Sequence, residues 1–208
     1  MISHRQRLED CLSNRRPDRV PVALWRHFPV DDQTPAGLAA ATLNYQQNFD
    51  FDLVKVTPAS SFCLKDWGAH DTWQGAEEGT RSYTRRVIEK PEDWGRLTRL
   101  NPEQGYLGAQ IDCLKMITGE LGEETPVLQT IFSPLAQAKN LVGGEALLAH
   151  LRRYPQAVHV GLARIAETTA AFIRAARKTG IAGIFYALQH AQYGLLSEME
   201  FAEFGERY

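Results

Sequence analysis

Short apolar runs and stretches of helical apolar spacing alternate along this chain. Four runs, each bounded by turn residues, are typical of strands buried in a sheet. They cover Arg19–Trp25, Asp50–Pro58, Thr125–Phe132 and Ile181–Leu188. Pro58 ends the second run, because proline has no N–H to donate to a neighbouring strand.

Helical spacing fills most of the intervals between the runs. The spacing predicts helices from about Ala36 to Phe49, over Leu107–Leu121, and from Pro155 until Gly180 ends the longest one. Capping-box patterns at Ser3 and Ser197 predict helix starts near both ends of the chain. Strands that alternate with helices indicate an α/β fold with a parallel sheet covered by helices.

One segment departs from this alternation. Polar and apolar residues alternate on both sides of a turn at Glu77-Glu78-Gly79, in Trp73–Gly75 and in Thr80–Thr84. This pattern predicts an antiparallel hairpin inserted after the second strand. Lys90 and Pro91 then open a short helix, with the proline in its first turn.

Composition and charge exclude several classes of protein. Of the 208 residues, 44% are hydrophobic and 23% charged, and the formal net charge is −2, as in an ordinary globular domain. Nucleic-acid binding driven by bulk charge is not expected. No apolar run approaches the roughly 20 residues of a membrane helix, and the charged N-terminus lacks a signal-peptide core. Cys11, Cys63 and Cys113 form no CxxC pair, which favours free thiols in a reducing cytoplasm.

Several strings, in this order, resemble the uroporphyrinogen decarboxylase family. They are Arg16–Val22 leading to Trp25-Arg26, Asp50–Val56 with Trp67-Gly68, Pro126-Val127 with Phe132–Leu135 and Leu141–Gly144, and Gly183–Ala187 followed by Leu196-Ser197. The resemblance spans the whole chain and implies a (β/α)₈ barrel of TIM type. Such a barrel typically needs ~250 residues. We therefore expect residues 1–208 to form one domain holding about the first half of the barrel.

The resemblance also implies an activity, the decarboxylation of carboxylate side chains of a tetrapyrrole without a cofactor. A pyrrole is protonated at carbon, the acetate arm loses carbon dioxide, and an aspartate stabilises the cation through the pyrrole N–H groups. Asp52 is the nearest acidic residue on the second strand, although its spacing to Pro58 is one residue longer than in the family. The alternative interpretation of Asp52 is an acid that opens the strand at the bottom of the barrel.

Barrel enzymes place their chemistry at the carboxyl ends of the strands, and the first two strands end in basic residues. Arg26 occupies the position of the first of two substrate-binding arginines in the family, while Val30 replaces the second. A guanidinium binds a carboxylate through two parallel hydrogen bonds. The alternative for Arg26 is a surface pair with Asp31 or Asp32. His27 is a second candidate for substrate binding, and Lys55 could hold an anion or pair with an acid.

The third and fourth strands supply the other candidates. Asn140 replaces a family tyrosine and Ala187 replaces a family serine. Tyr186 lies beside Ala187, and His190 could act as acid or base near pH 7. We expect Tyr186 and His190 to be catalytic together with Asp52. Substrate contacts are expected from Arg26, His27, Lys55, Ser133, Asn140 and Gln189.

Two other functions compete with the decarboxylase. Corrinoid- and zinc-dependent methyltransferases share the superfamily, and their His and Cys ligands belong to the second half of the barrel. The replaced site residues also suit a degenerate relative without catalytic activity. We expect a small-molecule substrate, either a tetrapyrrole or another carboxylate, with no metal and no cofactor. A homodimer or a missing second half is expected to complete the barrel.

Overall fold

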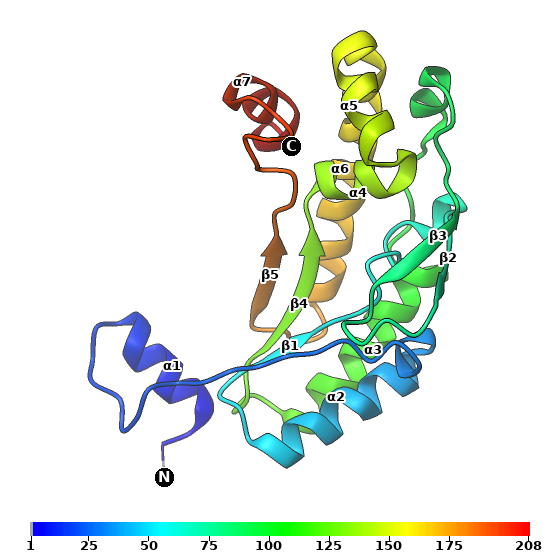
Figure 1. The fold of residues 1–208 in the computed structure, drawn as a ribbon. Coiled ribbons are helices and arrows are strands. Elements are labelled where there is room, and N and C mark those ends of the chain that lie inside the picture. Colours follow the sequence, from blue (N-terminus) through cyan, green and yellow to red (C-terminus); the bar gives the residue numbers. More distant parts are fainter. Residues whose placement is uncertain (1) are drawn as a thin grey trace.

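The computed structural model describes residues 2–208, in which helices and strands alternate as the sequence predicts (Figure 1). The helices are α1 (His4–Leu12), α2 (Pro35–Phe49), α3 (Gly105–Leu121), α4 (Pro134–Val142), α5 (Gly144–Arg153), α6 (Pro155–Arg177) and α7 (Glu198–Phe201), which continues as a π-helical turn over Ala202–Glu206. The strands are β1 (Val54–Val56), β2 (His70–Trp73), β3 (Arg81–Arg85), β4 (Val127–Phe132) and β5 (Gly183–Ala187). Short 3₁₀ helices cover Asp31–Gln33, Lys65–Trp67 and Pro91–Arg96.

The parallel sheet has three strands in the order β1-β4-β5. Its register pairs Lys55 with Leu128, and Thr130 with Phe185. Helices α2, α3 and α6 lie along one side of this sheet, while α1 lies apart from them near the amino ends of the strands (Figure 1). The predicted hairpin is confirmed, because β2 and β3 pair antiparallel. Along the sequence the hairpin comes after β1 and before β4, and it forms a separate two-stranded sheet.

The two faces of the sheet differ in their surroundings. On the helix-covered face, Val56 is fully buried, and Gln129 accepts a hydrogen bond of 2.9 Å from the Gln110 amide on α3. Since paired residues share a face, Lys55, Thr130 and Phe185 lie together on the opposite face. That face corresponds to the interior of a barrel.

The expected strand over Arg19–Trp25 is wrong. This segment runs past the sheet without joining it. Within the described chain, its one backbone hydrogen bond to the residues before β1 runs from the Asp52 N–H to the Val22 carbonyl, at 2.8 Å. Val20, Val22 and Leu24 are between 50 and 76% exposed. The apolar run has no partner layer to bury it here, so three parallel strands form instead of the four predicted.

A close helix contact fixes the outer layer. At Gly161 of α6, a Cβ would stand 2.3 Å from the Trp94 indole, so the backbone of the helix lies directly against the ring. Trp94 is fully buried and donates a hydrogen bond of 3.0 Å from Nε1 to His150 Nδ1. This contact joins the 3₁₀ helix Pro91–Arg96, α5 and α6.

The free edge of β5 carries apolar side chains. Ile184 and Tyr186 on this strand, and Leu188 just beyond it, are between 36 and 58% exposed. No strand among residues 2–208 pairs with this edge. No helix in the same part of the chain is both long and apolar enough to cross a membrane.

Candidate active site at the carboxyl ends of the strands

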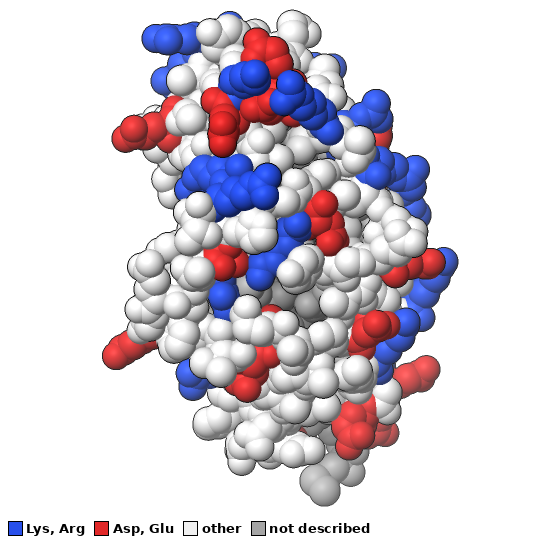
Figure 2. Space-filling view, turned by 90° about the vertical axis from the view of Figure 1, so that its right-hand side faces the viewer, with Lys and Arg blue, Asp and Glu red and all other residues white. Residues whose placement is uncertain are grey.

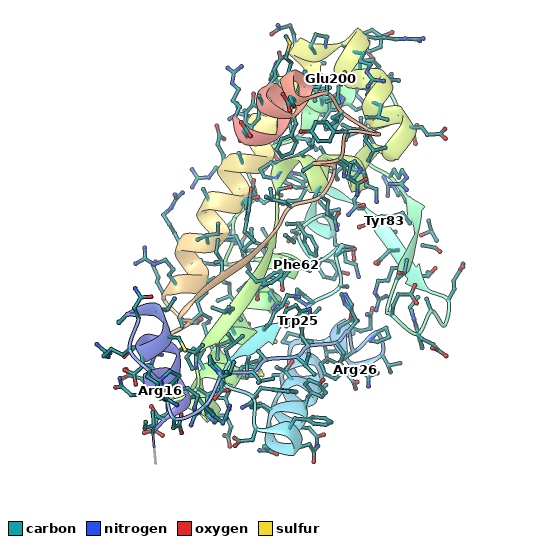
Figure 3. The ribbon with its side chains drawn as sticks, turned by 60° about the vertical axis from the view of Figure 1, so that its left-hand side comes forward. Arg16, Trp25, Arg26, Phe62, Tyr83 and Glu200 are labelled. Carbon is teal, nitrogen blue, oxygen red and sulfur yellow. The ribbon has the colours of Figure 1, made fainter. Side chains whose placement is uncertain are left out.

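Lys55 lies over two adjacent aromatic rings on the interior face of the sheet. Its Nζ is 4.9 Å from the centroid of the Trp25 ring and 4.5 Å from that of Phe185. The two rings stand 5.3 Å apart, and Figure 3 shows Trp25 beside the sheet. Burial against these rings lowers the Lys55 pKa to about 8. The ammonium can therefore give up its proton close to neutral pH.

His27 and Arg26 follow Trp25 and differ in their surroundings. The Cβ of His27 lies against Gly79 in the turn of the hairpin, and its Nδ1 is buried without a hydrogen-bond partner among residues 2–208. Burial, and then the charge of Lys55, lower the pKa of His27. Arg26 is exposed, and its guanidinium stacks on Phe28 at 5.6 Å.

Neither acid suggested as a surface partner of Arg26 forms that pair. Asp32 instead accepts a hydrogen bond of 2.6 Å from Arg81 of β3. Arg81 also lies 3.8 Å from Asp71, which Lys65 approaches at 3.2 Å. This buried charge group ties the hairpin to the 3₁₀ helices Asp31–Gln33 and Lys65–Trp67, and no sequence pattern indicated it. The alternating pattern of Arg81–Arg85 predicted the strand but not its ionic contacts.

Ser133 and Asn140 have structural contacts at the two ends of α4. The Ser133 hydroxyl accepts a hydrogen bond of 3.3 Å from the Ala136 N–H and caps the helix. The backbone carbonyl of Asn140 accepts one of 2.6 Å from Arg86 Nη1. Both residues are buried, but only Ser133 directly follows β4, whereas Asn140 lies in the last turn of α4.

The candidate residues at the end of β5 and after it, Tyr186, Gln189 and His190, have different surroundings. Tyr186 pairs with Ile131, so its side chain is on the helix-facing side of the sheet and away from Lys55. Gln189 is exposed. His190 has a left-handed backbone with φ 69°, and its Nδ1 is buried without a hydrogen-bond partner in the described chain. The structure therefore brings His27 and Lys55 together and leaves Tyr186 apart from them.

Asp52 lies at the opposite end of β1 in a group of paired charges. Its carboxylate is 2.5 Å from Arg7 Nη1 and 2.5 Å from Arg19 Nη1, and His4 Nδ1 is 3.0 Å away. Despite its burial, hydrogen bonds from Arg19 and His4 hold its pKa well below the usual range. These contacts fit the alternative interpretation, an acid at the bottom of the barrel.

Residues 2–208 contain no group of three or more His, Cys, Asp or Glu side chains placed to hold a metal ion. Cys63 and Cys113 are buried, which raises the pKa of each thiol to about 12. Both thiols are therefore protonated at neutral pH, the form that binds metals poorly.

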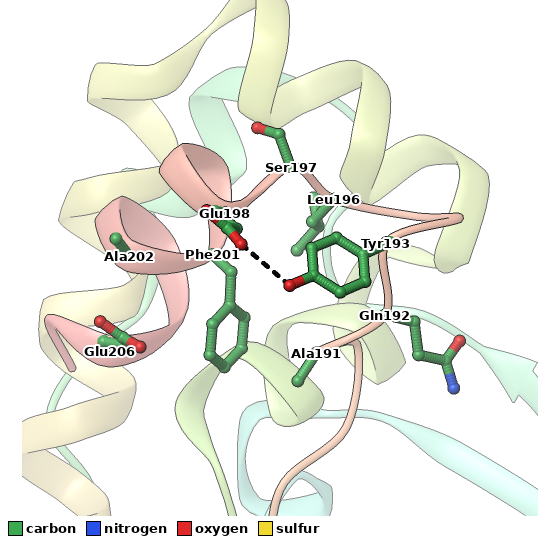
Figure 4. A pocket seen from close by; sticks show the side chains of 9 residues that line it. All are labelled: Ala191, Gln192, Tyr193, Leu196, Ser197, Glu198, Phe201, Ala202 and Glu206. Carbon is green, nitrogen blue, oxygen red and sulfur yellow. Dashed lines mark hydrogen bonds between the residues drawn. The ribbon is translucent and has the colours of Figure 1, made fainter.

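A cavity of about 450 Å³ lies elsewhere, between the chain after β5 and α7 (Figure 4). Tyr193 and Phe201 line it, and the Tyr193 hydroxyl donates a hydrogen bond of 2.9 Å to Glu198. None of the predicted site residues contributes to its wall. We therefore place the candidate site at the strand ends around Lys55.

Comparison with known proteins decides the family. The model of the family described as uroporphyrinogen decarboxylase (URO-D) matches residues 3–208. The chain belongs to this family. A uroporphyrinogen decarboxylase from Rhodococcus opacus (strain B4) is 30% identical over 132 residues, which are 61% of this chain and 36% of that protein.

A solved structure shows the fold. A methyltransferase from Methanosarcina mazei is 17% identical and superposes with a TM-score of 0.84 over 100% of this chain and 65% of that one. The likeness confirms the predicted barrel of TIM type, of which this chain of the URO-D family holds a part with an inserted hairpin. The chain spans less than two thirds of the length of either relative.

Proposed function

We propose that this URO-D family protein decarboxylates a carboxylate-bearing tetrapyrrole without a cofactor. The observation that carries the proposal is the Lys55 ammonium over the adjacent rings of Trp25 and Phe185 on the interior face of the sheet. The likeness to the Rhodococcus opacus decarboxylase supports the substrate class.

Lys55 suits a substrate that is both aromatic and anionic. No carboxylate among residues 2–208 lies within 4.0 Å of its Nζ, so the charge is free for a ligand. A partly desolvated ammonium attracts a carboxylate more strongly than one in water does. The flanking rings offer surfaces on which a pyrrole ring can pack.

The net reaction replaces a carboxymethyl arm by a methyl group and consumes one proton. The bond to the carboxylate breaks, carbon dioxide leaves, and the electron pair of that bond takes up the proton. The protonated form of Lys55, whose pKa is lowered, can bind the carboxylate of the substrate. His27 is a second group that can exchange a proton. Arg26 is placed at the rim, where it can hold an outer carboxylate.

The test is a lyase assay on uroporphyrinogen kept reduced, with products separated by their number of carboxylates. Wild-type protein should release carbon dioxide, and Lys55→Gln should lower kcat/KM by ~10–100-fold, the effect of losing one charged hydrogen bond. Arg26→Ala should chiefly raise KM. Lys115→Gln, at an exposed pair on α3, is the matched control and should be unchanged.

The same assay separates this proposal from the non-catalytic alternative. That alternative is supported by three positions, Val30, Asn140 and Ala187, at which this chain lacks the site residue of the family. Absence of turnover by folded wild-type protein, or equal turnover by Lys55→Gln, would rule out the role proposed for Lys55.

A further inference from the structure

Three basic side chains gather around the junction of α4 and α5, apart from Lys55. They are Arg86, which follows β3, Lys139 on α4, and His190, which follows β5. No carboxylate oxygen among residues 2–208 lies within 4.0 Å of any of the three. Elsewhere the same chain pairs Arg7, Arg19 and Arg81 with aspartates.

The three basic groups influence one another's ionisation. Burial, and then Arg86, lower the pKa of Lys139, while burial, and then Lys139, lower the pKa of His190. Arg86 and Lys139 carry like charges, which repel each other unless an anion lies between them. Figure 2 shows basic and acidic side chains side by side over much of the face that it displays.

One edge of the Arg86 guanidinium makes no hydrogen bond within the described chain. Nη1 donates a hydrogen bond of 2.6 Å to the Asn140 carbonyl, and the group stacks on Tyr83 with 5.1 Å between Cζ and the ring centroid. Nε and Nη2 make no hydrogen bond within residues 2–208. That edge has the two-donor geometry that matches a carboxylate or phosphate group.

The chain leaves room beside that edge. Gly143, with φ 102°, occupies a conformation that favours glycine, and a Cβ at this position would stand 3.5 Å from Arg86 Nε. Gly143 is also the residue before the first turn of α5, a helix of ten residues. The partial positive charge of this helix end adds to that of the guanidinium.

His190 supplies an independent sign of a ligand. Its Nδ1 is buried and has no hydrogen-bond partner in the described chain, and its backbone is left-handed although it is not a glycine. An unpaired buried polar atom and an unfavourable backbone both cost stability, and such costs concentrate at functional sites. An oxyanion would give the imidazole a partner.

We propose that Arg86, Lys139 and His190 form an oxyanion-binding site at the junction of α4 and α5, which takes a carboxylate or phosphate group. The site goes beyond the proposed decarboxylation, because it requires binding and no turnover. Lys139 is on the helix that follows β4, and His190 follows β5, so the site lies beyond the carboxyl ends of these two strands.

The experiment titrates the purified protein with inorganic phosphate and, separately, with succinate. Calorimetry gives the affinity, and the NMR signal of the His190 imidazole reports whether the probe reaches the site. Lys139→Gln removes a charge that makes no hydrogen bond in the described chain. His190→Asn removes the imidazole but keeps a residue that tolerates the left-handed backbone.

Both variants should bind the preferred probe at least tenfold more weakly, while Lys115→Gln should bind it as wild type does. Binding of phosphate alone indicates a phosphate group, and binding of succinate alone a carboxylate; either result supports the site. Equal affinity in wild type and Lys139→Gln, or no shift of the His190 signal with either probe, would overturn the proposal. Because no turnover is measured, this outcome is separate from failure of the lyase assay.

Discussion

The two ends of the parallel strands differ in whether the charges beside them are paired: all of those named at the amino ends are, whereas several at the carboxyl ends are not. At the amino ends, Arg7 and Arg19 meet Asp52, and Arg7 also makes a two-pronged pair with Asp18 at 2.6 and 2.8 Å. At the carboxyl ends, Lys55 and the group of Arg86, Lys139 and His190 have no carboxylate partner in the described chain. Compensated charge holds the scaffold together, and uncompensated charge is available to a ligand.

The largest effect should come from the compensated end. Asp52→Asn removes the charge that Arg7 and Arg19 share, and breaking a buried ion pair typically costs about 3 kcal/mol or more. Urea unfolding should show this loss of unfolding free energy. Asp112→Asn, at an exposed pair on α3, is the control and should stay within ~0.5 kcal/mol of wild type. An unfolding free energy unchanged in Asp52→Asn would contradict the scaffold role.

Acid should loosen the same end before the rest of the molecule. Asp18 has a pKa lowered to about 2 by hydrogen bonds from Arg7, so its contribution to stability is complete above its ordinary value near 4 and is lost as the pH falls toward 2. Asp52, also lowered, acts in the same direction. Hydrogen exchange in α1 should therefore speed up between pH 4 and 2, and more than exchange in α6. Equal acceleration in both helices would show that this end is not specially acid-sensitive.

The uncompensated end should respond to alkali instead. The Lys55 pKa is lowered from its ordinary 10.5 to about 8, so the unfolded chain holds more protons between these two values. The unfolding free energy of wild type should accordingly rise, relative to Lys55→Met, as the pH increases from 8 to 10.5. The difference between the two proteins isolates this residue from other titrating groups. A constant difference over that interval would show that Lys55 is not desolvated in the folded protein.

The smallest effect should follow a conservative change in the aromatic pair. Trp25→Phe keeps a ring near Lys55 and should raise KM in the lyase assay only a few-fold, because one cation–π contact is worth ~0.5–2 kcal/mol. Trp25→Ala removes the ring and should have the greater effect. Equal KM values for the two variants would show that the ring does not position Lys55.

The sequence predicted the elements that bury a face. Apolar periodicity correctly predicted strand β4, helices α3 and α6, and the hairpin. Each of these elements packs against a neighbouring element that buries its apolar side chains. The run Arg19–Trp25 has the same composition but lacks such a neighbour, and it is exposed. Helices α4 and α5 were not predicted, although Pro134 in the first turn of one and the apolar residues of both carried the signal.

The sequence predicted where candidate site residues stand along the chain, but not which way their side chains point. Lys55 and His27 were found because both lie near the carboxyl ends of apolar runs, and the charge of Lys55 acts on His27 in the structure. Tyr186 was placed at the correct strand end, yet the register turns it to the helix-facing side. Arg86 and Lys139 were missed because their proximity depends on how the hairpin packs against α4, and no local pattern records this contact.

The contact between Gly161 and Trp94 has a consequence for how sequences in this family can diverge. The indole occupies the space that any larger residue at 161 would need, so neither position can change freely while the other stays fixed. Relatives with alanine or serine at the first position should carry a smaller side chain at the second. Substitutions at these two sites should therefore be correlated across evolution, although 67 positions separate them along the chain.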